Sequence, residues 1–181
     1  VALNEAIDAA RRLLAHAKHA EGLGASWRAN EGLRGIAHEL GGRLSAFVKA
    51  DCMPEPSERV EDDILIRADK NPNTAAARAL FGGAAPAFDA GTDFVLVWGE
   101  GFDFARLPAT AKIIYLNAWL QPENGHADVF FPLSIQTERS GHYTNFQGVV
   151  SGFEPCFAKK PGVVDAEAVF AALASAPGDR S

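Results

Sequence analysis

The sequence has little cysteine, and its cysteines form no metal-binding pattern. Cys52 and Cys156 are the only two, they are far apart, and neither lies in a Cys-x-x-Cys motif. Cysteines alone therefore supply neither an iron–sulfur cluster nor a zinc site within these residues. Two separate thiols are also the ordinary state of a protein in the reducing cytosol. We expect no metal site here.

Long apolar runs and clusters of basic residues are missing as well. The apolar run Phe94–Trp98 is far shorter than the ~20 residues of a membrane-spanning helix. The chain has 17 Lys and Arg against 23 Asp and Glu, which gives a formal net charge of -6. Nucleic-acid binding requires clustered basic residues, and only two adjacent pairs occur, Arg11-Arg12 and Lys159-Lys160. The sequence therefore predicts no nucleic-acid partner and no direct membrane insertion.

An initiator methionine is also absent. The chain begins with Val1, and its single methionine is Met53, so we expect a piece of a longer polypeptide. Its 181 residues, 48% of them hydrophobic, suit one domain with one core.

Alternation of strand-like and helix-like segments is the main pattern of the sequence. Apolar runs typical of buried strands occupy residues 45–50, 64–66, 94–98, 113–116 and 129–131. Apolar residues recur at helical spacing in residues 3–17 and 30–40. The same spacing occurs in an Ala-rich segment that follows 71–74 and ends near 82, and in a last segment after 165. This alternation predicts a single α/β, Rossmann-like domain over residues 1–181, with a largely parallel sheet flanked by helices and with 94–98 as its central strand.

Several residues predict where these elements begin and end. Gly22 and Gly24 are expected to end the first helix, so that residues 23–26 form at most a short edge strand. Asn30 and Asp165 are expected to be helix N-caps. Residues 51–62, which are rich in proline and acidic side chains, are expected to form a surface loop.

The stretch from Ala127 to Gly148 combines a strand with a polar, glycine-containing turn. Ligand sites of open α/β sheets lie at the carboxyl ends of strands, and Glu138, Gly141, Thr144 and Asn145 follow the predicted strand 129–131. We expect Thr144 and Asn145 to bond local backbone groups and to hold the loop in shape.

A second strand end carries the sequence Gly99-Glu100-Gly101. It supplies the first glycines of a G-x-G-x-x-G phosphate loop, but Phe104 occupies the third glycine position. The carboxylate of Glu100 would also repel a pyrophosphate. We therefore expect a tight turn here and no nucleotide.

The order of residues in the stretch from Ala127 to Gly148 resembles the pattern of the molybdopterin oxidoreductase superfamily. The matching residues are Ala127-Asp-Val, two apolar residues, Pro132, and then Glu138, Gly141, Thr144, Asn145 and Gly148. The resemblance is greatest to the carboxy-terminal, molybdopterin-oxidoreductase-like domain of the large iron–sulfur subunit, the G subunit, of bacterial NADH:quinone oxidoreductase, respiratory complex I. The run Asn71-Pro-Asn-Thr also resembles that subunit.

The resemblance implies a fold like the molybdopterin-binding domain of formate dehydrogenase or DMSO reductase. It implies a cytoplasmic place in the peripheral arm, other subunits of the respiratory complex as partners, and a role in electron transport from NADH to quinone. The iron–sulfur clusters of such a subunit would be bound outside these residues.

Three polar positions depart from the family pattern. His142 replaces Thr, Gln147 replaces Glu, and Val149 replaces Arg, and the last change removes a bidentate anion donor. We therefore expect no catalytic residue, no metal and no bound cofactor in the domain itself, which would be a non-catalytic scaffold. Its vestigial pocket would comprise Gly99, Glu100, Glu138, Gly141, Thr144 and Asn145.

Two alternatives stay open. In the first, the chain is the cofactor-holding portion of an active molybdenum or tungsten bis-pterin oxidoreductase such as formate dehydrogenase. In the second, it is a small-ligand binding module. His16 and His19, three residues apart on the first helix, are expected to lie on a solvated face and to bind no metal.

Overall fold

The computed structural model describes residues 2–25, 28–48, 62, 64, 71–84 and 86–175. Except for Asp62 and Ile64, the loop predicted for 51–62 and the strand predicted for 64–66 lie outside these residues. So does Cys52.

The centre of the domain is a five-stranded parallel sheet with the strand order β2-β1-β3-β4-β5. The predicted α/β class with a parallel sheet is therefore confirmed. β3 pairs with β1 on one side and with β4 on the other, and all of its residues are buried, as predicted for the central strand. The strands are β1 (Ala20–Gly24), β2 (Ser45–Val48), β3 (Phe94–Trp98), β4 (Lys112–Asn117) and β5 (Val129–Pro132).

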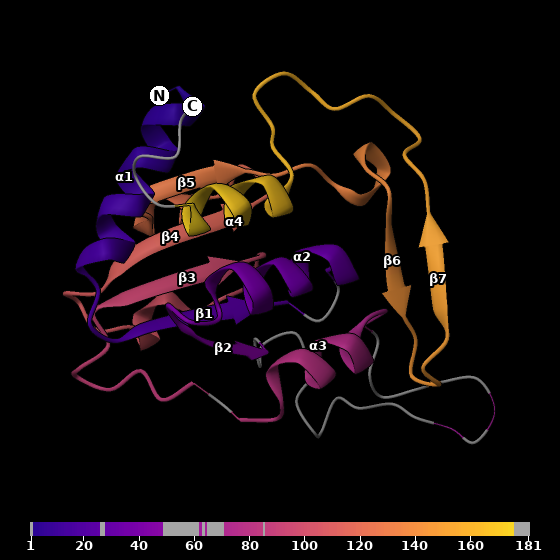
Figure 1. Ribbon diagram of the computed structural model, residues 1–181, viewed down its shortest axis with the longest axis horizontal. Coiled ribbons are helices and arrows are strands. Elements are labelled where there is room, and N and C mark those ends of the chain that lie inside the picture. The colour runs from indigo at the N-terminus through magenta and orange to yellow at the C-terminus, as the bar shows by residue number, and fades with distance from the viewer. Residues whose placement is uncertain are drawn as a thin grey trace.

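The α-helices pack on one face of this sheet (Figure 1). Their buried residues, such as Leu14, Leu33 and Phe170, form one apolar cluster with Leu96 and Ile114 of the sheet. This burial is the main driving force for the layer. The helices are α1 (Leu3–His16), α2 (Asn30–Gly35) with its π-helical continuation η1 (Ile36–Leu40), α3 (Thr74–Phe81) and α4 (Ala166–Ala174).

The second face of the sheet is covered differently. Its apolar cluster joins Val95, Val97 and Tyr115 to Phe102 and Phe104, which come from the connection between β3 and β4, and no residue of α1, α2, α3 or α4 belongs to it. The expectation that helices flank the sheet thus holds for one face of the described structure. Short 3-10 turns lie in the connections: η4 (Phe104–Arg106), η5 (Pro122–His126) and η6 (Gln136–Glu138).

A two-stranded hairpin, which the sequence analysis did not predict, stands across the carboxyl ends of the strands (Figure 1). It consists of β6 (Gly141–Thr144) and β7 (Val150–Phe153), which pair antiparallel. Gly148 has a φ of 82°, which glycine adopts without strain, and it closes the turn by donating its N–H to the carbonyl of Asn145.

The start of the sheet corrects two predictions. Gly22 and Gly24 do not end the first helix, which stops at His16; they lie in β1, an interior strand between β2 and β3. A Cβ at Gly22 would collide with Cδ1 of Leu44, so the Leu44 side chain would have to shift to admit any other residue. Of the strand predicted as buried at 45–50, the described residues 45–48 form β2, which is partly exposed and lies at one edge of the described sheet.

One of the two predicted N-caps is correct. Asp165 is the N-cap residue of α4, although its carboxylate accepts hydrogen bonds from Ser134 and Lys159 and not from a helix amide. Asn30, in contrast, is the first residue of α2, and Ala29 is its N-cap. Both side chains serve tertiary contacts, which local sequence does not reveal. Within the described residues, no helix has the length and apolar character needed to cross a membrane.

Replacement of Leu96 by Ala should lower the free energy of unfolding by about 2–5 kcal/mol, because the side chain is fully buried in β3 and its loss leaves a cavity. Urea denaturation measures this change. The matched control is Leu120→Ala, at a residue 95% exposed, where the change should stay within about 0.5 kcal/mol. Equal effects of the two substitutions would contradict the central position of β3.

Candidate functional site

The strand order reverses between β1 and β3, because the chain proceeds from β1 toward β2 and from β3 toward β4. In open α/β sheets, ligands bind at the carboxyl end of such a junction. Arg28 lies shortly after β1, while Gly99 and Glu100 follow β3. Gly99 has a φ of 101°, so its turn requires glycine. This junction is the candidate site.

An ion pair occupies the junction. The Nη2 atom of Arg28 lies 3.0 Å from the Oε2 atom of Glu100, and the guanidinium carbon lies 5.6 Å from the centre of the Trp98 ring. The Arg28 side chain is only 9% exposed. Glu100 was expected to repel a pyrophosphate, and the guanidinium of Arg28, which faces it, offsets that charge.

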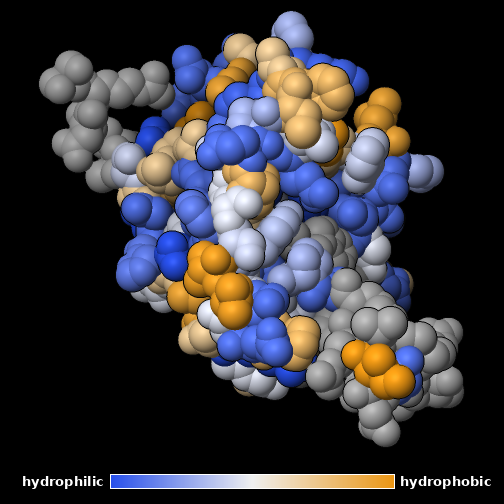
Figure 2. Space-filling model, turned by 90° about the vertical axis from the view of Figure 1, so that its right-hand side faces the viewer, coloured by the Kyte–Doolittle hydropathy of each residue, from blue (hydrophilic) through white to orange (hydrophobic). Residues whose placement is uncertain are grey.

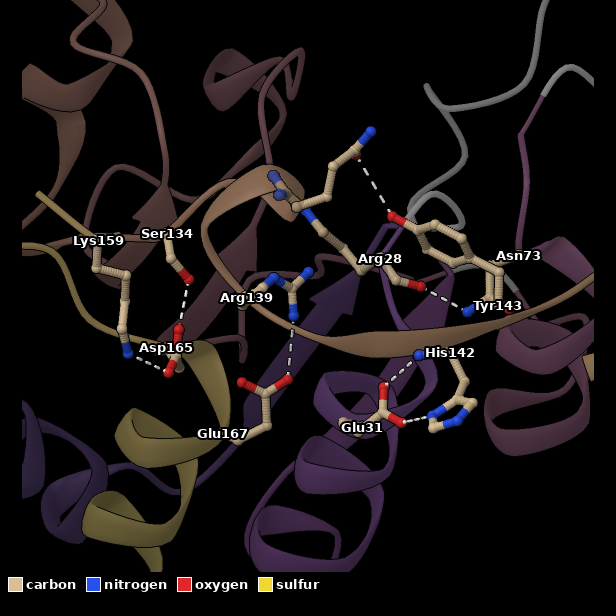
Figure 3. Close-up of polar contacts among 11 residues, drawn as sticks. Arg28, Glu31, Asn73, Ser134, Arg139, His142, Tyr143, Lys159, Asp165 and Glu167 are labelled. Carbon is tan, nitrogen blue, oxygen red and sulfur yellow. Dashed lines mark hydrogen bonds and ion pairs between the residues drawn. The ribbon is translucent and has the colours of Figure 1, made fainter. Parts of the chain in front are cut away.

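The side chain of Asn73 joins three segments of the chain next to this pair. Its Nδ2 donates to the carbonyl of Arg28 at 2.5 Å, and its Oδ1 accepts the backbone N–H of Thr144 at 2.5 Å. Asn30 donates from Nδ2 to Oγ1 of Thr144 at 3.1 Å. Because Asn73 and Asn30 are buried, these bonds fix the end of β6 over the junction. Figure 3 shows the bond between Asn73 and Arg28.

Glu31 of α2 holds the start of β6. Its Oε2 accepts the backbone N–H of His142 at 3.0 Å, and its Oε1 lies 2.6 Å from Nδ1 of the same histidine (Figure 3). A side chain on Gly141 would meet Phe153 and the Glu31 carboxylate, so the glycine permits this approach. Burial raises the pKa of Glu31, but the hydrogen bonds from His142 outweigh it and lower that pKa overall.

Further charged contacts connect the segment after β5 with α4. Nη1 of Arg139 lies 3.3 Å from Oε1 of Glu167, and Asp165 accepts from Oγ of Ser134 at 2.5 Å and from Nζ of Lys159 at 2.5 Å (Figure 3). Burial raises the pKa of Asp165, whereas Lys159 and Ser134 lower it, and the net shift is downward. These contacts orient the connection that leads into β6.

The structure brings together only part of the predicted vestigial pocket. Glu100 and Thr144 both contact the Arg28–Asn73 group, through the ion pair and through the backbone bond. Glu138 does not take part, because its Oε2 accepts the N–H of Ile135 at 3.2 Å.

The local role predicted for Asn145 is confirmed. Its Oδ1 accepts the N–H groups of Gln147 and Val149 at 2.9 and 3.0 Å, and it thereby shapes the hairpin turn. The same prediction for Thr144 was wrong, since its partners are the distant residues Asn30 and Asn73.

Four residues of the site escaped the sequence analysis: Arg28, Asn30, Glu31 and Asn73. Asn30 was interpreted only as a helix N-cap, and Asn73 only as part of the stretch 71–74 that precedes a helix. The one available indication was the position of Arg28 and Asn30 shortly after a strand of an α/β sheet, where ligand and closure contacts lie. That indication was lost because at most a short edge strand was expected at 23–26, in place of the interior strand β1.

As arranged, the junction does not fit a dinucleotide pyrophosphate. The guanidinium of Arg28 is buried and faces Glu100, so an anion would have to displace a carboxylate that is already paired. Among the described residues no group of three or more His, Cys, Asp and Glu side chains could hold a metal ion. His16 and His19 lie on exposed positions, and Cys156 is exposed. That the domain holds no cofactor stays a prediction.

Asn73→Ala should lower the free energy of unfolding by about 1–3 kcal/mol, because it leaves the Arg28 carbonyl and the Thr144 N–H unpaired at a buried position. The exposed Asn4 on α1 provides the control, and Asn4→Ala should have little effect or be slightly stabilising. Urea denaturation compares the two. A cost for Asn73→Ala no larger than that for Asn4→Ala would show that Asn73 does not secure the hairpin.

The pH dependence of stability should contain a contribution from Glu31. Because folding lowers its pKa, its stabilisation is present above the unfolded value of about 4.3 and is lost as pH falls through the lower folded value. Glu31→Gln should therefore flatten the decline of stability in acid below about pH 4.3. Glu39→Gln, at an exposed position of η1, is the control. Identical acid profiles for Glu31→Gln and the unaltered protein would rule out this contribution.

The junction between β1 and β3 thus contains polar side chains, and its main charges, on Arg28 and Glu100, are paired with each other. Its cover is a strand held by side chains of α2 and of the residue that precedes α3. Comparison of the chain with protein-family models and with curated proteins finds no match.

Proposed function

We propose that this chain is a non-catalytic scaffold domain of the molybdopterin-oxidoreductase-like kind, in the peripheral arm of an NADH:quinone oxidoreductase. In this proposal its Rossmann-like fold is retained from a cofactor-binding relative, while its own role is to support neighbouring subunits. Electrons pass from NADH toward quinone through iron–sulfur clusters bound elsewhere in the parent subunit. The resemblance of residues 127–148 to that family supplies the identity of the complex.

The observation that carries the proposal is the state of the β1–β3 junction. A functional anion site needs donors that are free to meet the ligand, whereas the Arg28 guanidinium here faces Glu100 and lies over Trp98. His142 of β6 has its Nδ1 directed at Glu31. These side chains stabilise one another, which suits a structural role.

Exposed apolar residues support a role in contacts with neighbouring subunits. Trp119 and Leu120 lie in the connection after β4, and Phe157 lies in the connection after β7. On the side of the molecule shown in Figure 2, hydrophobic residues form separate patches within a largely hydrophilic surface. Aromatic and large apolar residues at exposed positions are typical of interface centres.

One observation favours the alternative of a cofactor-holding domain from a molybdenum or tungsten oxidoreductase. Arg28 brings a guanidinium to the junction, and the sequence analysis had found no cation there. If Glu100 released it, this group could pair bidentately with a phosphate. The two functions therefore differ in whether the Arg28–Glu100 pair opens.

Isolation of the intact parent complex, with this domain present, separates the two functions. We expect NADH:quinone oxidoreductase activity in the purified complex, with molybdenum and tungsten far below stoichiometric amounts and with no pterin fluorescence. Elemental analysis and a pterin assay on the oxidised, denatured complex are the measurements. A stoichiometric molybdenum or tungsten pterin would overturn the scaffold function and establish the alternative.

Variants of Arg28 in the same complex sharpen this test. In a scaffold, Arg28→Ala should lower thermal stability because the ion pair with Glu100 is lost, while turnover per assembled complex stays unchanged. Arg28→Lys keeps the charge and should restore part of the stability. Loss of a bound pterin in Arg28→Ala, with its retention in Arg28→Lys, would instead assign Arg28 to cofactor binding.

A further inference from the structure

The two edges of the β6–β7 hairpin differ in how their backbone groups are satisfied. The register pairs Tyr143 with Ser151 and Gly141 with Phe153, and the N–H of Asn145 donates to the carbonyl of Val149 at 3.0 Å. Because hydrogen-bonded and non-hydrogen-bonded pairs alternate in an antiparallel ladder, these pairs bond within the hairpin. The intervening residues direct their N–H and C=O groups outward; they are His142 and Thr144 on β6, and Val150 and Gly152 on β7.

The outward amides of β6 are both bound by side chains. The N–H of His142 donates to Oε2 of Glu31 at 3.0 Å, and the N–H of Thr144 donates to Oδ1 of Asn73 at 2.5 Å. Oxygens from α2 and from the turn before α3 thus take the place of a neighbouring strand. This edge of the hairpin is closed.

The outward edge of β7 is open. Within the described part of the chain, the N–H groups of Val150 and Gly152 have no hydrogen-bond partner, and β7 is the outermost strand in Figure 1. Val150 is 56% exposed, and Ser151 and Gly152 are also exposed. β7 contains no charged residue and no proline, which are the usual means of preventing strand addition at an edge. This edge can therefore accept another strand.

We propose that β7 pairs antiparallel with β7 of a second copy of this chain, about a two-fold axis at Ser151. In this register Val150 lies opposite Gly152 of the second copy, and each pair exchanges two hydrogen bonds. All outward amides of both β7 strands are then satisfied. The hairpins join into one four-stranded antiparallel sheet.

The side chains of β7 and its neighbours match each other in this arrangement. Val150 faces a glycine, which leaves room for its branched side chain, and Val149 lies opposite Phe153, a β-branched and aromatic pair of the kind that stabilises sheets. Glu154 lies opposite Gly148, so no like charges meet at the axis. The same surface serves both copies, as a two-fold interface requires.

The interface is short, because β7 has only four residues, and stable interfaces bury about 800 Å² on each partner. The dimer is therefore weak and depends on protein concentration. The pairing uses backbone groups that the scaffold function leaves unused, and it does not rest on that function.

Val150→Pro tests the proposal, because proline removes an outward N–H without removing a bond inside the hairpin. Val150→Thr keeps the N–H and the branched shape and is the matched control. Sedimentation velocity over a wide concentration range should show the mass of the unaltered chain and of Val150→Thr doubling, while Val150→Pro stays monomeric. Hydrogen exchange at positions 150 and 152 should slow as the concentration rises in the unaltered chain and in Val150→Thr. In Val150→Pro, exchange at Gly152 should not depend on concentration.

A second variant and a disruption control keep the test decisive if Val150→Pro loses stability. Val150→Lys places like charges near the axis and should also abolish the dimer, with unchanged thermal unfolding. Ser151→Pro removes an N–H that bonds within the hairpin and shows the effect of hairpin loss itself. A monomer at every concentration, a dimer that persists in both Val150→Pro and Val150→Lys, or concentration-dependent protection away from β7 would each overturn the proposal.

Discussion

The structure depends on the burial of β3 from both sides. Every residue from Phe94 to Trp98 is buried, with alternate side chains in the two apolar clusters that lie on opposite faces of the sheet. Such a strand loses all water contact, so it needs a paired strand on each side to satisfy its backbone. β1 and β4 provide these pairs, and the remaining strands extend the sheet outward. The position of the β1–β3 junction follows directly from this constraint.

Closure of that junction is achieved by polar side chains rather than by apolar contact. Asn73 binds the backbone of Arg28 and of Thr144, and Glu31 binds the backbone of His142. Carboxylate and amide oxygens thus act in place of an additional strand along β6. A buried amide that satisfies two backbone groups is costly to replace, so the same contacts that close the junction also determine where the hairpin stands.

The proposed scaffold function and the proposed pairing of β7 arise from opposite edges of one hairpin. Its inner edge is fixed to the body of the domain, and this removes freedom from the residues around Arg28 and Glu100. Its outer edge retains the bonding capacity of an unpaired strand. A rigid attachment on one side makes the free side a better template, since less conformational entropy is lost when a second strand binds.

Periodicity and composition determined the α/β class, the central strand Phe94–Trp98, and the existence of a helix that begins at Leu3 and of an Ala-rich helix that ends near Gly82, because each of these depends on short-range spacing of apolar residues. The hydrogen bonds of the Asn145 side chain to nearby backbone were also predictable, since its partners lie within four residues. Tertiary structure alone decided the contacts of Asn30, Asn73 and Thr144, whose partners are far away in sequence. It also decided that Gly22 and Gly24 lie in an interior strand and that Arg28 neutralises Glu100. A polar side chain carries no record of a distant partner in its local sequence, because it can bond equally well with nearby backbone, with water, or with a residue that only the folded chain brings close.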